Sequence, residues 1–132
     1  MKGLAKISEV PLGAFIMIDG KPVRCVSRCK IGDRVYFNGK ESFHTLDAVA
    51  EWYLLPQNLS SKVVSILPSE TSDGINVLIV ITVIQYDHHD DEYFWFICDQ
   101  RQEIVSDNTK SCGYDTANEA IAAAQNTVAN FI

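Results

Sequence analysis

The chain has 132 residues, of which 47% are hydrophobic and 21% are charged, as is ordinary for a single globular domain. Its formal net charge is −6 at pH 7, and an acidic chain binds phosphate backbones poorly, so we expect no nucleic-acid partner. The longest apolar stretch, around residues 75–84, is too short to cross a bilayer as a helix, and the first residues lack the pattern of a signal peptide. We therefore expect a cytoplasmic protein without a membrane partner.

The charges are divided unevenly along the chain. Residues 1–40 carry eight Lys and Arg against three Asp and Glu, whereas residues 41–132 carry three against fourteen. Such a division can mark a partner surface. It also fits a basic segment that packs beside an acidic one and evens out the field, and the sequence leaves both interpretations open.

The first 43 residues predict an antiparallel meander. Strands are expected at 14–18, 23–29 and 34–37, with hairpin turns at Asp19-Gly20 and Asn38-Gly39, because Asp-Gly and Asn-Gly pairs favour tight turns. The run Leu-Gly-Ala-Phe-Ile-Met-Ile-Asp-Gly-Lys-Pro-Val, at the start of this meander, resembles the hairpins of SH3-like barrel modules. The resemblance rests on turn chemistry, and no function follows from it.

A first helix is predicted after Thr45, because threonine is a good N-cap residue. Apolar residues then recur at helical spacing, and Pro56 stops the pattern. The predicted stripe consists of Leu46, Val49, Ala50, Tyr53 and Leu54. We expect this helix to help cover one face of a sheet.

The middle of the chain predicts a hairpin that is buried on both faces. Residues 75–84 and 93–98 are almost continuously apolar, whereas a half-exposed strand alternates apolar and polar residues. The second face then needs a cover. Other parts of the chain, a second copy in a homodimer and a bound ligand all remain open as that cover.

A second helix is predicted near the end of the chain. Thr116 and Glu119 form a Thr-x-x-Glu capping box at its start. Further strands are expected at 62–67 and 102–105. The predicted buried stripe of the helix consists of Ala117, Ala120, Ile121, Ala124, Val128 and Phe131.

Together these elements predict an α+β fold with the order β-β-β(-β)-α-β-β-β-β-α. The sheet is expected to be mainly antiparallel, with about six to seven strands and two helices, because strands occur in runs with helices between them. We expect one domain over residues 1–132, with residues 1–58 and 59–132 as sub-lobes.

The densest polar cluster is the segment Tyr86-Asp87-His88-His89-Asp90-Asp91-Glu92. Histidine and carboxylate are ligand types that a catalytic metal uses, so His88, His89 and Asp90 are candidate metal ligands of a small metal-assisted enzyme. The simpler interpretation is a hydrated hairpin loop between two apolar strands. No other pattern of catalytic residues accompanies it.

Aromatic residues supply the candidate binding contacts. Because aromatic side chains are enriched at partner surfaces, we assign this role to Trp52, Tyr93 and Trp95. The favoured hypothesis is a non-enzymatic interaction domain without a cofactor, which binds a protein or a small molecule and forms a homodimer. The alternatives are the metal-assisted enzyme and an acidic inhibitor or immunity-type protein that neutralises a basic partner.

Overall fold

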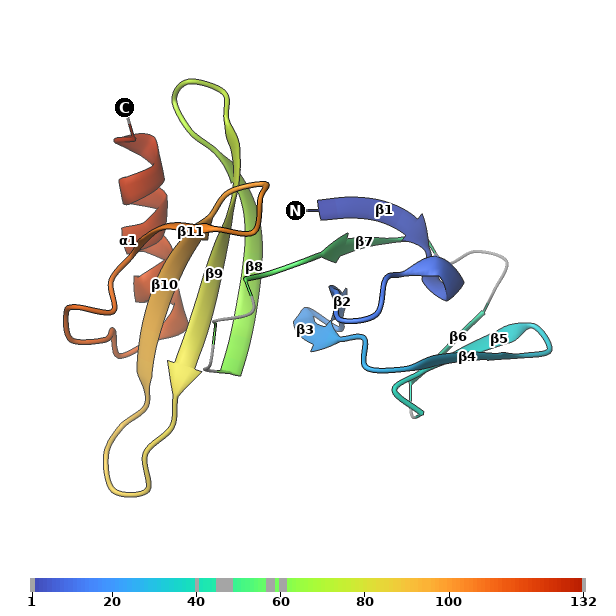
Figure 1. Ribbon diagram of the computed structural model, residues 1–132. Helices are drawn as coiled ribbons and strands as arrows, with labels where there is room; N and C mark the ends of the chain where they lie inside the picture. The colour runs from blue at the N-terminus through green and yellow to red at the C-terminus, as the bar shows by residue number, and fades with distance from the viewer. Residues whose placement is uncertain (1, 40, 45–48, 57–58, 60–61, 132) are drawn as a thin grey trace. The chain divides into compact units, whose positions relative to one another are not determined.

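A computed structural model describes residues 2–39, 41–44, 49–56, 59 and 62–131 (Figure 1). The chain divides into two compact units, Met1–Leu55 and Pro56–Ile132, which we call the N-terminal unit and the C-terminal unit. The expectation of a single domain with sub-lobes 1–58 and 59–132 stays a prediction.

The N-terminal unit consists of two small antiparallel sheets. The four-stranded sheet has the order β1-β7-β2-β3, and the three-stranded sheet has the order β4-β5-β6. A short 3-10 helix, η1 (Ile7–Glu9), follows β1. The strands are β1 (Lys2–Lys6), β2 (Phe15–Ile18), β3 (Lys21–Arg24), β4 (Arg28–Ile31), β5 (Arg34–Phe37), β6 (Glu41–His44) and β7 (Val49–Tyr53).

Both predicted hairpin turns of this unit are confirmed. Asp19 and Gly20 have φ angles of 52° and 77°, and they join β2 to β3. Asn38 and Gly39 have φ angles of 56° and 75°, and they join β5 to β6. Positive φ at both central residues is the geometry of the hairpin turn that Asp-Gly and Asn-Gly pairs favour.

The strand predicted at 23–29 is wrong, because the chain leaves the first sheet after Arg24 and enters the second at Arg28. The side chain of Asn38 forms hydrogen bonds with the backbone groups at this corner. Its Oδ1 accepts from the N–H groups of Val26 and Ser27 at 2.7 and 3.2 Å, and its Nδ2 donates to the carbonyl of Arg24 at 2.7 Å. A side chain therefore satisfies donors that a continuous strand would have paired.

One hydrophobic core lies within the N-terminal unit. Its buried side chains come from both sheets and from the segments that join them, and they are Val10, Ala14, Ile16, Cys25, Val35 and Phe37. Partly buried side chains of β7, including Ala50 and Trp52, pack against this cluster.

The helix predicted after Thr45 is wrong. Residues 45–48 lie outside the described part of the chain, and Val49–Tyr53 is strand β7, paired with β1 on one side and β2 on the other. The same residues also alternate, because Ala50, Trp52 and Leu54 pack on the core while Glu51 does not. Pairing with two neighbouring strands outweighed a helical pattern that extended over only a few turns.

The C-terminal unit is a four-stranded antiparallel sheet with one helix. The sheet has the order β11-β10-β9-β8, so consecutive strands are neighbours. The elements are β8 (Lys62–Glu70), β9 (Asn76–Ile84), β10 (Glu92–Cys98), β11 (Ile104–Asp107) and α1 (Ala117–Ala129).

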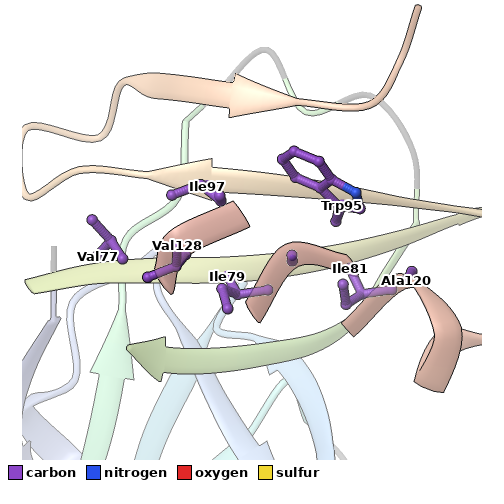
Figure 2. Close-up of a cluster of buried hydrophobic side chains, with 8 residues drawn as sticks. Val77, Ile79, Ile81, Trp95, Ile97, Ala120 and Val128 are labelled. Carbon is purple, nitrogen blue, oxygen red and sulfur yellow. The ribbon is translucent and has the colours of Figure 1, made fainter. Parts of the chain in front are cut away.

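Helix α1 packs on one face of this sheet, as Figure 2 shows. Val77, Ile79 and Ile81 of β9 lie against Ala124 and Val128 of the helix in one buried cluster. The predicted N-cap Thr116 is confirmed, because the Glu119 N–H donates to Thr116 Oγ1 at 3.2 Å, and the Thr116 hydroxyl is also 3.2 Å from Glu119 Oε1, to which it donates. The predicted stripe is confirmed as well, since Ala120, Ala124 and Val128 are buried and Ala117, Ile121 and Phe131 pack against the cluster.

Residues on both faces of the β9–β10 hairpin are buried, as predicted. Leu78 and Val80, which alternate with the residues that face α1, are 5% and 0% exposed. Phe94 of β10 is 8% exposed. The homodimer remains a prediction.

Strand β8 continues beyond the end predicted at residue 67. Pro68 lies within it, and the strand ends at Glu70. Because β8 is the terminal strand of its sheet, a proline can direct its missing N–H away from the ladder. Pro68 therefore does not end the strand, because β8 lies at the edge of the sheet.

The predicted α+β fold with two helices is wrong. Within the described residues the chain forms eleven strands in antiparallel sheets and a single α-helix, against the expected six to seven strands. Val49–Tyr53, which lie in the predicted first helix, form strand β7. Strand β1 is an additional strand that the sequence pattern did not indicate. None of the helices in the described residues is long and apolar enough to span a membrane.

The close approach of α1 to the sheet generates a prediction. Ala124 is fully buried, so Ala124→Leu should crowd the helix–sheet contact and lower the free energy of unfolding by about 1–3 kcal/mol. Ala122 is exposed on the same helix, so Ala122→Leu is the matched control and should change stability little. Urea unfolding measures both, and equal effects of the two substitutions would contradict this packing.

Candidate functional site

The four-stranded sheet of the N-terminal unit has one face that lies away from the core cluster of Ile16, Val35 and Phe37. Directly paired residues of neighbouring strands project to the same face. Lys2 pairs with Tyr53, Tyr53 with Phe15, and Phe15 with Arg24. These four residues therefore form one row across β1, β7, β2 and β3, with a cation at each end and two aromatic residues between them.

A second row lies two residues further along the strands of the same face. It contains the pair Leu4 and Glu51 and the pair Met17 and Pro22. Lys6, two residues beyond Leu4 on β1, projects to this face as well because side chains alternate along a strand. We call the face that carries these rows the outer face.

The outer face exposes large apolar side chains. Leu4 is 69% exposed and Met17 is 39% exposed. The cations Lys2, Lys6 and Arg24 are exposed around them, on the two edge strands β1 and β3. Apolar side chains that gather on a sheet face within a charged rim are typical of a docking surface.

The aromatic residues of the outer face are partly covered. The guanidinium of Arg24 lies over the ring of Phe15, with its carbon 5.7 Å from the ring centroid, within the range of a cation–π interaction. The Arg24 Nε–H also donates to the carbonyl of Gly13 at 3.4 Å. Tyr53 is only 4% exposed, so this ring is a buried support rather than a contact.

Glu51 contributes negative charge between the cations of the outer face, and it is held by Tyr53. The Tyr53 hydroxyl donates to Glu51 Oε2 at 2.7 Å. Burial, together with the hydrogen bond to Glu51 and the charge of its carboxylate, raises the pKa of Tyr53 to about 12. With Glu51 engaged in this way, positive charge prevails at the edges of the face.

Trp52 lies on the opposite side of the same sheet. Its indole packs against the core of the N-terminal unit and directly over Gly3, where an added Cβ would clash with the ring. Gly3 is therefore the residue that makes room for Trp52 under β1. The assignment of Trp52 as a binding contact stays a prediction, and the structure places its side chain in a supporting position.

The other two candidate contacts lie in the C-terminal unit. Trp95 is 7% exposed and belongs to the cluster against α1 (Figure 2). Tyr93 is half-buried and exchanges backbone hydrogen bonds with Tyr114 at 2.9 and 2.8 Å. Trp52 therefore belongs to one unit and Tyr93 and Trp95 to the other, and their role as contacts stays a prediction.

The candidate metal ligands lie in the loop between β9 and β10. His88, His89 and Asp90 are exposed, and the His89 ring meets the edge of Tyr86 at a centroid distance of 6.0 Å. In the described part of the chain, no group of three or more His, Cys, Asp or Glu side chains could hold a metal ion. The loop therefore offers hydrated polar side chains without an arranged ligand set.

Two thiols are buried and two are exposed. Burial raises the pKa of Cys98 to about 12 and also raises the pKa of Cys25, so neither is a nucleophile at neutral pH. Cys29 and Cys112 are exposed, and all four cysteines are free.

Comparisons of the chain with protein-family models, with curated proteins and with solved structures found no match. The functional hypothesis therefore rests on the chain's own geometry. The metal-assisted enzyme and the acidic inhibitor both stay predictions.

The buried phenol of Tyr53 generates a prediction about pH. The folded state holds its proton more tightly than the unfolded chain, because the pKa rises from 10.0 to about 12 on folding. The corresponding stability is fully present below pH 10 and is lost as the pH rises through 12. Denaturant unfolding over this range should show a steeper loss for the native chain than for Tyr53→Phe, and identical slopes would contradict the shift.

The β9–β10 loop generates a prediction about metals. We expect elemental analysis of the purified protein to find no zinc, iron or manganese in stoichiometric amount, and chelator treatment to leave the melting temperature unchanged. The control is the double substitution His88→Ala with His89→Ala, which should give the same elemental profile. A metal that binds one per chain and is lost in this variant would instead support the enzyme hypothesis.

Proposed function

We propose that this protein is a non-enzymatic binding domain whose N-terminal unit docks an acidic protein segment on the outer face. The observation that carries the proposal is the pair of exposed apolar residues, Leu4 and Met17, framed by cations on both edge strands. We call Leu4 and Met17 the apolar centre. Glu51 of β7 lies between them, and the cations form a charged rim on the same sheet surface.

The apolar centre supplies the favourable energy of binding. Moving an exposed leucine or methionine side chain out of water is worth about 1.5–3 kcal/mol when burial is complete. Leu4 is 69% exposed and Met17 is 39% exposed, so most of that energy is available to a partner at Leu4 and a smaller part at Met17. Tyr53 and Phe15 lie beside them in the adjacent row of the same face.

The charged rim selects the partner. Lys2 and Lys6 lie on β1, and Arg24 lies on β3, so cations flank the apolar centre on two sides. Opposite charge on a partner speeds the encounter and excludes basic competitors. A segment with acidic residues around an apolar side chain complements this pattern.

A protein segment fits the outer face better than a nucleic acid does. Single-stranded nucleic acid needs free aromatic ring faces for base stacking. Tyr53 is buried, and Phe15 is half-buried beneath the Arg24 guanidinium, so neither ring is open for stacking.

The charge of the rim can be tested directly. Lys2→Glu with Arg24→Glu should weaken binding to a mixture of synthetic peptides rich in glutamate and leucine by at least about tenfold, because a buried or rim ion pair becomes a repulsion. Fluorescence polarisation measures the affinity. The matched control is Lys21→Glu with Lys30→Glu, which makes the same change in net charge with exposed lysines outside the outer face.

Two results would contradict the proposal. Equal weakening by the control pair would mean that only net charge matters. Tight binding of single-stranded oligothymidine, with no binding of the peptides, would assign the face to nucleic acid.

The apolar part of the outer face is tested with Leu4→Ser and Met17→Ser, against Leu12→Ser as an exposed apolar control elsewhere in the unit.

A further inference from the structure

Strand β1 is the terminal strand of the four-stranded sheet. It pairs with β7 along one edge, and no described strand pairs with its other edge. The register with β7 runs without a shift from Lys2 to Lys6. An unpaired strand edge presents a row of backbone N–H and C=O groups that can template another strand.

Two other edges of the described sheets carry features that block strand addition. The terminal strand β3 contains Pro22, which has no N–H, and β8 contains Pro68 and a register shift between Val63 and Ser65. Strand β1 has neither a proline nor a register shift. Its backbone edge is therefore regular enough to pair.

The charges of β1 discriminate between partners. Antiparallel pairing of β1 with a second copy of itself would place Lys2 opposite Lys6, and like charges directly opposite one another are destabilising. An acidic strand in the same place would instead put carboxylates beside both lysines. The edge is thus guarded against self-association and open to a partner of opposite charge.

The residues between the lysines suit a neighbouring strand. Gly3 and Ala5 carry minimal side chains and are half-buried, so they leave the approach to the backbone open. Leu4 projects to the outer face between the lysines and is exposed. A strand paired with β1 would therefore meet a cation, an apolar side chain and a second cation at alternate positions, namely Lys2, Leu4 and Lys6.

We infer, resting on the proposed function, that the acidic segment binds as an extended strand added to the outer edge of β1. Its side chains on the outer face follow the pattern acidic, apolar, acidic at alternate positions, opposite Lys2, Leu4 and Lys6. In this pairing the segment uses the part of the outer face on β1, whereas Met17 and Arg24 lie two and three strands away. Its backbone continues the four-stranded sheet, so the main chain supplies affinity and the alternate side chains supply specificity.

The probe is a synthetic peptide with the core Glu-Val-Leu-Val-Glu. This sequence is a palindrome, so it fits either strand direction. The backbone groups of alternate residues point to opposite edges of a strand. One version carries N-methyl groups on both valines, and a second version carries them on the leucine and the glutamates.

We expect the parent peptide and one N-methylated version to bind with similar affinity, and the other version to bind at least about tenfold more weakly, because only one set of N–H groups faces β1. Hydrogen exchange should slow at β1 amides when the parent binds. A peptide with lysines in place of the glutamates should bind the Lys2→Glu, Lys6→Glu protein and not the native one.

Three outcomes overturn the inference. Equal binding of both N-methylated versions would show that the strand edge is not used, although the rim substitutions could still confirm the proposed function. Loss of binding by both versions would overturn it as well, since one strand offers one edge to β1. Failure of the parent peptide, while the glutamate–leucine mixture binds through the rim, would show docking on the face without strand addition.

Discussion

The N-terminal unit depends on the position of β7 between β1 and β2. Five consecutive residues of β7 pair with β1, and two of them pair with β2 on the other side. This register aligns the first residues of the chain with Arg24 and makes the rows of the outer face. It also directs Trp52 to the core, where the indole occupies the space that Gly3 leaves. Without β7 the edge strand would have no sheet to extend.

Local signals predicted the parts of the fold that are themselves local. Asp19-Gly20 and Asn38-Gly39 form the expected hairpin turns because their backbone geometry is decided by two residues. Thr116 caps the helix for the same reason, since its partner is only three residues away. The β9–β10 hairpin was predictable because its two continuous apolar runs can be recognised in the sequence without knowledge of the residues that pack against them.

Long-range pairing decided the parts that were missed. The alternation Lys2, Leu4, Lys6 is visible in the sequence, but a stretch of five residues forms a strand only when β7 pairs with it. The helical spacing through Tyr53 failed because the same residues also alternate at period two. The outer face could therefore not be predicted from short stretches of sequence. The candidate aromatic contacts Trp52 and Trp95 pack with the cores of their units.

The corner held by Asn38 has a chemical consequence. Asparagine followed by glycine is the context in which a side-chain amide hydrolyses most readily, and the product is a carboxylate. A carboxylate could still accept from Val26 and Ser27, but it has no proton to donate to the carbonyl of Arg24. Two oxygen atoms would then face one another at the junction of the two small sheets. Slow hydrolysis of Asn38 would therefore weaken the corner at which the chain passes from the four-stranded sheet to the three-stranded sheet.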